Sequence, residues 1–402
     1  MTDEISPPPV AQRATATGRL PGLDEAPWDR AVNGTRVLFG EGRLEALGAL
    51  VRDLGGTRVL VVTDPGLVQA GHADKARVSL RKESLPATVF AGVEENPTTL
   101  HVAAGVQVAR REKIDFIVGL GGGSSLDCAK GINFILSNGG EMEDYRGTNR
   151  ASRPMLPSLG VPTTAGTGSE AQAYALISRA ADREKMACGD DKARFRAVIL
   201  DPGLLASVPR RVAAVAGMDA IAHAVESFAS LPADDTARMF AGEAWRLLST
   251  HLLQALDESS GPPAWAPMLW GAHLAGAGID RAMLGAAHAC ANPLTARYGV
   301  PHGIAVALML PHVVRFNGEK IAATYVDLQA RAGMAAASPN DLAKRIEALR
   351  AACHLPATLA DAGVDTSSLP ALAEEAARQW TAGFNPRPVT AHDLVELYRQ
   401  AA

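Results

Sequence analysis

Hydrophobic and polar positions follow two alternating patterns in the first half of the chain. Short apolar runs, which are typical of buried strands, fall at 58–64, 87–93 and 115–123. Between them, apolar residues recur every three or four positions over 42–55 and 99–113, which predicts helices. Strands that alternate with helices in this way indicate a parallel sheet covered by helices.

The second half of the chain shows one pattern only. After residues 196–209 the strand patterns fade, and helical patterns rich in Ala and Leu continue to the end, interrupted by Gly and Pro. Residues 1–33 are rich in Pro, Ala, Thr and Gly without apolar periodicity, so we expect a flexible arm or a surface wrap there. The predicted organisation is an arm (1–33), an α/β domain (34–205) and an all-helical domain (206–402).

Composition narrows the classes of partner. The chain of 402 residues carries 39 Lys and Arg against 43 Asp and Glu, with no basic stripe, so neither a nucleic acid nor an acidic membrane surface is indicated. No segment approaches about 18 uninterrupted apolar residues, the length that a membrane span needs. We therefore expect no membrane segment, and a small molecule as the partner.

The four cysteines indicate a reducing compartment. Cys128, Cys188, Cys290 and Cys353 are widely spaced and form no C-x-x-C pair, which argues against a thiolate zinc site and a disulfide framework. The N-terminus has acidic residues and prolines where a signal peptide would need a basic start and an apolar stretch. These features predict a cytoplasmic protein.

A glycine-rich turn follows the third predicted strand. The stretch "DFIVGLGGGSSLDCAK" has the order strand, Gly121–Gly123, and a helix that opens at Ser124 or Ser125. Glycines let a backbone approach a phosphate, and a helix N-terminus attracts an anion, so the turn suits a dinucleotide pyrophosphate. It departs from the G-x-G-x-x-G fingerprint, and a tight turn with a serine cap is the alternative interpretation.

Two more stretches of the first half fit a nucleotide. The loop "PTTAGTGSE" (162–170) combines hydroxyls and glycines that could line a sugar and phosphate channel, or form a polar surface loop. Asp64 ends the first predicted strand, where a carboxylate can accept hydrogen bonds from a ribose and would repel a 2'-phosphate. That role would favour NAD over NADP, while an Asp before Pro65 and Gly66 is also a common turn former.

Polar groups interrupt the apolar helical pattern of the second half. Asp219 and His223 stand at i and i+4, so their side chains leave one face of a helix. They could share a metal ion, or Asp219 could cap the helix while His223 sits in the core. His288, in a helical stretch, and His302, in a turn flanked by Pro and Gly, complete a set of three imidazoles and one carboxylate that suits iron or zinc. The other candidates for this set are Glu226, His251, His273 and His312.

These motifs, in this order, carry a resemblance. From about Thr35 to about Tyr398 the chain resembles the iron-containing, or group III, alcohol dehydrogenase family, through "VVTDPGLVQAG", "GGGSSLDCAK", "PTTAGTGSE", "GMDAIAHAVESF" and "GAAHACANPLTARYGVPHG". The resemblance implies a dehydroquinate synthase-like fold, with an α/β, Rossmann-like N-terminal domain, an all-α C-terminal domain and an active site between them.

The resemblance also assigns expected roles to single residues. It places the metal ligands on Asp219, His223, His288 and His302, with Glu226 in support of them. It places the cofactor contacts on Asp64, Asn96, Gly122, Gly123, Ser124, Asp127, Thr163, Thr164, Thr167 and, near the same channel, Lys185. For Lys185, an exposed salt bridge is the alternative interpretation.

The implied activity is NAD-dependent hydride transfer between a small primary alcohol and its aldehyde. Fe²⁺, or Zn²⁺ in some relatives, would lower the pKa of the alcohol and polarise the aldehyde. One alternative is a related reductase or transhydrogenase that acts on a hydroxy or oxo acid or on a phosphonate-bearing aldehyde. A second is a non-catalytic nucleotide- or metal-binding protein. Members of the family are often homodimers or larger assemblies, and we expect the same here.

One position departs from the family pattern. Many members carry a histidine for proton relay four residues after the ligand that matches His288, and here that residue is Asn292. An amide cannot take up a proton near neutral pH. We therefore expect Asn292 to orient substrate or water, while the proton leaves through the cofactor ribose, water or another side chain.

Overall fold

The computed structural model describes residues 20–334 and 338–402, which form two compact units. One unit contains the chain up to Thr164 together with Gly168–Ser207, and the other contains Ala165–Thr167 and Val208–Ala402. Each unit is described separately below. Residues 1–19 of the predicted arm lie outside the described residues.

The first unit is built on a seven-stranded sheet. Its strands, in spatial order, are β1 (Trp28–Val32), β2 (Thr35–Phe39), β10 (Ala197–Leu200), β7 (Ser158–Pro162), β5 (Phe116–Gly121), β3 (Val59–Val62) and β4 (Ala87–Phe90). All neighbouring pairs are parallel except β1 and β2, which are antiparallel. The predicted parallel sheet is confirmed, and β3, β4 and β5 lie within the three predicted strand segments.

Burial along the strands follows their place in the sheet. Every residue of β3 and β5 is buried, because a parallel strand inside a sheet is covered by helices on both faces. Every residue of β4 is only half-buried, since β4 lies at the edge. The apolar runs at 58–64 and 115–123 therefore correspond to central strands, and the run at 87–93 to an edge strand.

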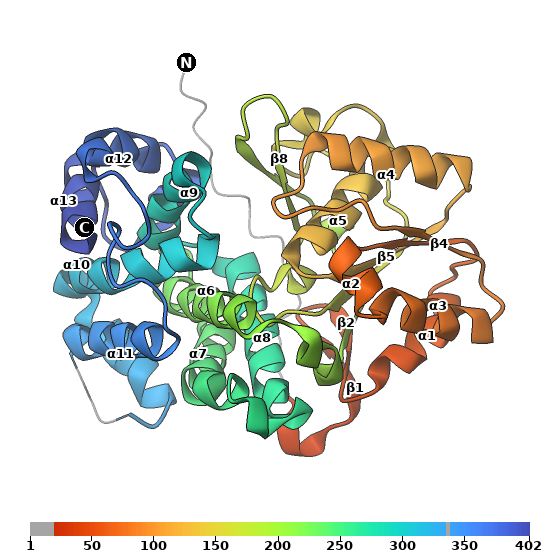
Figure 1. The fold of residues 1–402 in the computed structure, drawn as a ribbon, viewed down its shortest axis with the longest axis horizontal. Coiled ribbons are helices and arrows are strands. Elements are labelled where there is room, and N and C mark those ends of the chain that lie inside the picture. The colour runs from red at the N-terminus through yellow and green to blue at the C-terminus, as the bar shows by residue number, and fades with distance from the viewer. Residues whose placement is uncertain (1–19, 335–337) are drawn as a thin grey trace. The chain divides into compact units, whose positions relative to one another are not determined.

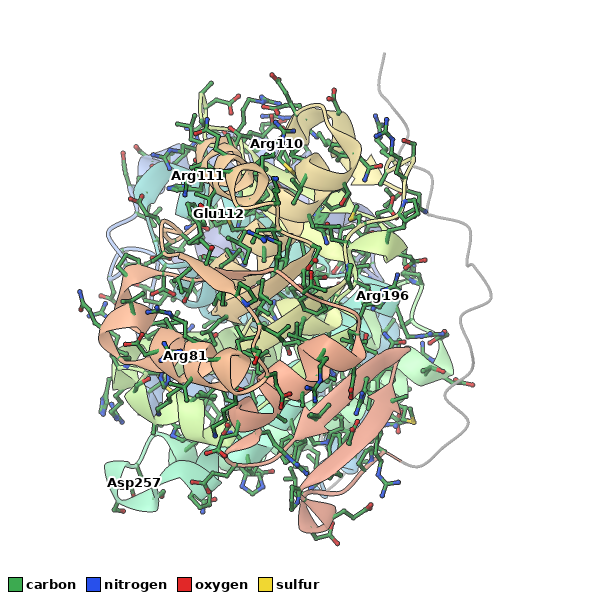
Figure 2. All side chains as sticks on the ribbon, turned by 90° about the vertical axis from the view of Figure 1, so that its right-hand side faces the viewer. Arg81, Arg110, Arg111, Glu112, Arg196 and Asp257 are labelled. Atoms are coloured by element: carbon green, nitrogen blue, oxygen red, sulfur yellow. The ribbon has the colours of Figure 1, made fainter. Side chains whose placement is uncertain are left out.

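Helices cover both faces of this sheet (Figure 1). They are α1 (Leu47–Asp53), α2 (Pro65–Gln69), α3 (His72–Lys82), α4 (Thr99–Arg111) and α5 (Gly123–Asn138). α1 packs against α3, and α4 packs against α5 on the opposite face, as right-handed crossovers between parallel strands require. Arg110 and Arg111 (Figure 2) stand in the last turn of α4, where positive charge interacts favourably with the helix dipole.

The prediction of an arm over 1–33 is wrong for its last residues. Residues 28–32 form strand β1, which pairs with β2 through a turn at Asn33 and Gly34. Both turn residues have positive φ angles, 48° and 80°, and the Asn-Gly sequence favours this kind of hairpin turn. The hairpin also buries Trp28, which stacks on Phe39 with the ring centroids 5.1 Å apart.

A second, three-stranded sheet belongs to the same unit and was not predicted. Its strands, in spatial order, are β6 (Gly147–Thr148), β9 (Lys185–Gly189) and β8 (Tyr174–Ser178). β8 and β9 form an antiparallel pair, and α5 packs against β8.

The second unit is helical. Its helices are α6 (Arg210–Ala229), α7 (Asp235–Ala255), α8 (Trp265–Ala282), α9 (Ala286–Tyr298), α10 (His302–Arg331, with a kink at Ile321), α11 (Pro339–Ala352), α12 (Leu369–Ala377) and α13 (Ala391–Ala401). The prediction of an α/β part followed by an all-helical part is confirmed.

Helix α6 runs through the core of the helical unit. It packs against α7, α8 and α10, and its residues from Gly217 to Ala229 are all buried. Among the described helices, α6 alone is long and apolar enough to match a membrane span, and 83% of the matching window is buried inside the protein. Polar side chains on such a helix are costly unless they have partners.

Candidate metal centre and nucleotide-binding loops

Two polar side chains of α6 face the same point in the helical unit. Asp219 and His223 are each 5% exposed, and His223 Nε2 lies 3.5 Å from Asp219 Oδ1. Their separation of one helical turn brings both to one face, as the sequence predicted. Asp219 lies well inside α6, so it does not cap this helix.

The other two predicted ligands converge on Asp219 from different helices. His288, on α9, places Nε2 3.5 Å from Asp219 Oδ1, and Nε2 of His302 lies 4.0 Å from the same oxygen. His302 was expected in a turn but is the first residue of α10, after Pro301. The ligand atoms of Asp219, His288 and His302 all lie within 4.8 Å of one another.

The rival histidines lie elsewhere. His251 is within hydrogen-bond distance of Gln254, His273 stacks on Trp270, and His312 is half-buried on α10. None of them joins the group of possible ligand atoms found in the described part of the chain.

The donor set fits a divalent cation. Two ligand atoms that are each about 2.1 Å from an ion and at a tetrahedral angle to it stand roughly 3.4 Å apart. The distances from Asp219 Oδ1 to His223 and His288 are both 3.5 Å. Asp219 Oδ1 and His288 Nε2 are buried and have no hydrogen-bond partner within the described residues, which is costly unless a cation pairs with them.

The electrostatics of the cluster favour the ligand forms of Asp219 and His223. Burial alone would raise the pKa of Asp219, but His223, His302 and His288 outweigh burial and hold this pKa well below its usual range. Burial lowers the pKa of His223, so this imidazole is neutral near pH 7. A carboxylate and a neutral imidazole are the forms that bind metals.

Glu226 fixes the orientation of His288. Its Oε2 lies 2.5 Å from His288 Nδ1, and both side chains are about 5% exposed. Burial would lower the pKa of His288, but Asp219 and Glu226 raise it to about 9. With Nδ1 held by Glu226, the ring presents Nε2 towards Asp219, which is the role of a carboxylate behind a metal-bound histidine. Glu226 was a candidate for either a metal ligand or a residue that supports one, and this geometry favours the supporting role.

Asn292 follows His288 by one turn of α9 and is half-buried. Its Nδ2 donates a hydrogen bond of 3.0 Å to Oε1 of Gln379, a residue that the sequence did not single out. The amide of Asn292 is thus held by a second amide.

The predicted cofactor residues of the first unit gather mostly at one edge of its large sheet. Asp64, Asn96, Gly122–Ser124 and Thr163–Thr164 follow the carboxyl ends of β3, β4, β5 and β7. Those strands are parallel, so their carboxyl ends share one edge, the usual place for a ligand in an α/β sheet.

The glycine turn leads directly into helix α5. Gly121 has a φ of 152°, and a side chain there would lie 2.6 Å from Ser125. Gly122 is the N-cap of α5, which begins at Gly123, and a Cβ at Gly122 would only touch Thr164 at 3.5 Å. Gly121 therefore serves the turn itself, whereas Gly122 leaves space next to the helix N-terminus, where an anion would be stabilised.

Asp64 has a structural role whatever else it does. It is the N-cap of α2, and its Oδ1 accepts a hydrogen bond of 3.1 Å from the Leu67 amide. Its Oδ2 accepts a weaker one of 3.4 Å from Ser125, in the first turn of α5. The turn-forming interpretation holds, and the same carboxylate lies next to the glycine turn.

Three predicted cofactor residues have other surroundings in the structure. Asp127 is buried on α5, 3.7 Å from the fully buried ammonium of Lys130, and burial raises the pKa of Asp127. Lys185 begins β9 of the small sheet and is exposed. Thr167 belongs to the stretch Ala165–Thr167, which groups with the helical unit, where Gly166 packs against Ala216 of α6.

Comparison with known proteins identifies the family. Residues 34–202 match the family described as iron-containing alcohol dehydrogenase, and residues 213–402 match the C-terminal part of the Fe-containing alcohol dehydrogenase family. The chain belongs to the iron-containing alcohol dehydrogenase family. It is therefore an oxidoreductase of a family whose members act on alcohols and aldehydes.

Individual members of this iron-containing family are similar over nearly their whole length. The chain is 34% identical to the 1,3-propanediol dehydrogenase of Citrobacter freundii, over 90% of this chain and 96% of the relative. A crystal structure of a 1,3-propanediol oxidoreductase, 34% identical, superposes with a TM-score of 0.87 over 91% of this chain and 97% of the other. The sulfoacetaldehyde reductase of Bifidobacterium kashiwanohense, in complex with NAD+, is 26% identical and superposes with a TM-score of 0.84 over 93% and 98%.

Proposed function

We propose that this iron-containing alcohol dehydrogenase family member is an NAD(H)-dependent enzyme that interconverts a small primary alcohol and its aldehyde with the help of a divalent metal. The observation that carries the proposal is the convergence of three imidazole nitrogens on one buried oxygen, Asp219 Oδ1, at 3.5 to 4.0 Å. Asp219, His223, His288 and His302 would hold Fe²⁺, or Zn²⁺ as the alternative, because imidazole and carboxylate ligands accept both.

The bound metal would supply Lewis acidity, which lowers the pKa of an alcohol and polarises an aldehyde carbonyl. The protein groups around it have separate tasks. Asp219 stays ionised, His223 stays neutral, and Glu226 holds the Nδ1 side of His288 so that Nε2 faces inward. The site is thereby arranged before any substrate arrives, which lowers the reorganisation needed during the reaction.

NAD(H) is the proposed hydride carrier. The glycine turn, the N-terminus of α5 and the loop after β7 gather at the carboxyl edge of the parallel sheet, where a pyrophosphate would be favoured. The structural relative from B. kashiwanohense was solved with NAD+. The carboxylate of Asp64 would disfavour the 2'-phosphate of NADP.

Asn292 would take part by orientation and not by proton transfer. Gln379 accepts a hydrogen bond from its Nδ2, which leaves Oδ1 of Asn292 to accept one from a substrate hydroxyl or a water. An Asn292→His variant is expected to alter the pH profile of kcat, because an imidazole can carry a proton near pH 7. An unchanged rate and pH profile would remove any role of this position in catalysis.

A substrate panel tests the proposed function directly. The protein, reloaded anaerobically with Fe²⁺ or Zn²⁺, is mixed with NADH and small aldehydes, and with NAD+ and alcohols such as 1,3-propanediol. We expect NADH to be consumed or released with at least one pair, and the activity to disappear on chelation. Binding of NADH without turnover of any compound would favour a non-catalytic protein, and turnover without free NADH would favour a transhydrogenase.

Two further sequence predictions belong to this proposal. The enzyme is expected to be a homodimer or a larger homo-oligomer, which light scattering on the full chain measures. It is also expected in the cytoplasm, where its four free cysteines would stay reduced.

A further inference from the structure

A short loop, Phe384–Arg387, hydrogen-bonds to α9 and α10 and to the residues that end α6, the three helices that carry the proposed ligands. We propose that this 384–387 loop, through Asn385, positions His288 for metal binding. The inference rests on the proposed function, since it concerns the site where the metal would bind.

The start of α9 depends on side chains from elsewhere in the unit. Its N-cap is Gly285, which has no side chain to cap the first amides. Asn385 Oδ1 accepts a hydrogen bond of 3.2 Å from the Ala286 amide. Glu226 accepts bonds of 2.7 Å from the Ala287 amide and 3.4 Å from the His288 amide. Asn385 and Glu226 therefore fix where α9 begins, two residues before His288.

Asn385 is itself held firmly. It is 2% exposed, and its amide pairs reciprocally with that of Asn317 on α10, at 3.0 and 2.7 Å. Its Nδ2 also donates to the carbonyl oxygen of Arg387 at 2.6 Å. A buried amide with all these partners has little freedom to move, so it transmits the position of α10 to the start of α9.

The neighbours of Asn385 attach the same loop to the other two ligand helices. The carbonyl oxygen of Phe384 accepts hydrogen bonds from the Leu231 amide at 3.0 Å and from Ser230 Oγ at 3.3 Å, directly after α6. The guanidinium of Arg387 donates to the Phe316 carbonyl at 2.8 Å and lies 3.7 Å from the centroid of the Phe316 ring, on α10. The loop thus spans the ends or flanks of α6, α9 and α10.

The limited space around Gly285 is a second observation on the contact of Asn385 and Glu226 with the start of α9. A Cβ at this position would lie 2.9 Å from Asn385 Oδ1, which is closer than Cβ atoms are found in proteins, and 3.0 Å from Glu226 Oε1, which is tighter than most Cβ contacts. The φ of Gly285 is -128°, which any residue can adopt, so the close approach and not the backbone angle calls for glycine. Even a methyl group here would push the two capping side chains away from α9.

The test compares metal binding by two variants of the full chain. Co²⁺ is titrated in the presence of a competing chelator, and its visible absorption bands report the ligand geometry. For Asn385→Ala we expect the Kd for Co²⁺ to rise about 10- to 100-fold, the usual cost of losing an outer partner of a metal ligand, with shifted absorption bands. Gly285→Ala, which leaves every hydrogen-bonding side chain present, is expected to change both readouts in the same direction, and it carries the test if Asn385→Ala does not fold.

Asn133 on α5 supplies a matched control. It is 1% exposed and exchanges hydrogen bonds with the backbone of Leu156 at 2.9 and 3.1 Å, but it lies in the other unit. Asn133→Ala should lower the melting temperature like Asn385→Ala while leaving the Co²⁺ Kd and spectrum unchanged. Wild-type Kd and spectrum in both Asn385→Ala and Gly285→Ala would overturn the positioning role. If the wild-type chain binds no Co²⁺ at these ligands, the metal site of the proposed function fails instead, and the positioning role fails with it.

Discussion

The two units of this protein present their candidate functional groups in different ways. In the helical unit, three histidine side chains meet around Asp219 from three helices, and Glu226 places His288 by a further buried contact. In the sheet unit, the candidate groups are mostly the turn and hydroxyl residues that follow four parallel strands. The metal site is therefore built from side-chain chemistry, and the nucleotide site mainly from backbone geometry.

This difference predicts how each unit responds to substitution. A side chain that donates a metal ligand has no substitute, so its loss should abolish function at once. A backbone amide is supplied by every residue except proline, so substitutions at the nucleotide loops should act through added bulk or altered charge, and with smaller effects.

The largest effect is expected in the helical unit. Removal of the imidazole in His288→Ala takes away one ligand and leaves the buried Glu226 without its bond to Nδ1. Lewis-acid assistance amounts to several kcal/mol, so we expect kcat to fall by about 10³-fold, with NADH binding unchanged. Steady-state kinetics on the metal-loaded protein, with metal content measured in parallel, checks this prediction. Full activity in the variant would contradict the metal mechanism.

Substitutions at two neighbouring glycines, Gly122 and Gly121, test the role of backbone geometry in the sheet unit. Gly122→Ser adds a good N-cap residue whose Cβ makes only an ordinary contact with Thr164, so the melting temperature should hold. The KM for NADH should rise about tenfold, because the side chain occupies the expected phosphate position. Gly121→Ala, at a φ of 152° and 2.6 Å from Ser125, should instead destabilise the fold by about 1–3 kcal/mol. Thermal melts and NADH titrations separate the two. An unchanged KM in Gly122→Ser would count against the glycine turn as the pyrophosphate site.

A smaller effect is expected from charge alone at Asp64. Asn is as good an N-cap as Asp, so Asp64→Asn keeps the hydrogen bond from the Leu67 amide. The variant removes the negative charge, and the weak hydrogen bond of 3.4 Å that Ser125 donates to Oδ2 is replaced by one in which Ser125 would accept. We expect kcat/KM with NADPH to rise about tenfold relative to that with NADH, since repulsion of a 2'-phosphate is lost. The ratio of the two rates in wild type and variant is the measurement. A ratio that does not change would leave Asp64 with its capping role alone.

The same contrast explains what the sequence could and could not predict. Metal ligation restricts the residue type and the spacing, so Asp219 and His223 stood out on an apolar helix, and His288 and His302 completed the set. The central strands could also be predicted from the sequence, because burial on both faces requires continuous apolar runs. Backbone geometry restricts the sequence less, so each predicted nucleotide motif had a structural alternative, a turn for the glycine stretch and Asp64 and a polar surface loop for 162–170.

Contacts between distant parts of the chain were missed. Asn385 meets the Ala286 amide across 99 positions, and an asparagine before a proline reads only as a turn. The β1–β2 hairpin was missed for a different reason, since Asn33-Gly34 is a recognisable turn signal that the Pro- and Ala-rich composition around it obscured. In the small sheet, β6 has two residues and pairs with β9, which is distant in sequence. β8 and β9 pair across residues 179–184, a stretch without Gly, Asn or Pro that carries no recognised turn signal.

The smallest predicted effect compares two histidines, His312 and His72, that lie outside both sites. Burial, together with Arg315 and Arg350, lowers the pKa of His312 on α10 to about 4, and burial also lowers the pKa of His72 on α3 in the sheet unit. A histidine with a depressed folded-state pKa stabilises the fold above its unfolded pKa of about 6.5, and this contribution is lost as the pH falls towards the folded value.

Stability should accordingly decrease between pH 6.5 and pH 4, and His312→Gln should flatten that decrease more than His72→Gln does. We expect the difference to be about 2–4 °C in melting temperature at pH 5, the shift produced by about 1 kcal/mol in a unit of this size. Melting curves at several pH values, recorded for the wild type and both variants, make the comparison. Equal pH dependence in all three proteins would mean that neither histidine is held neutral by its surroundings, in the helical unit or in the sheet unit.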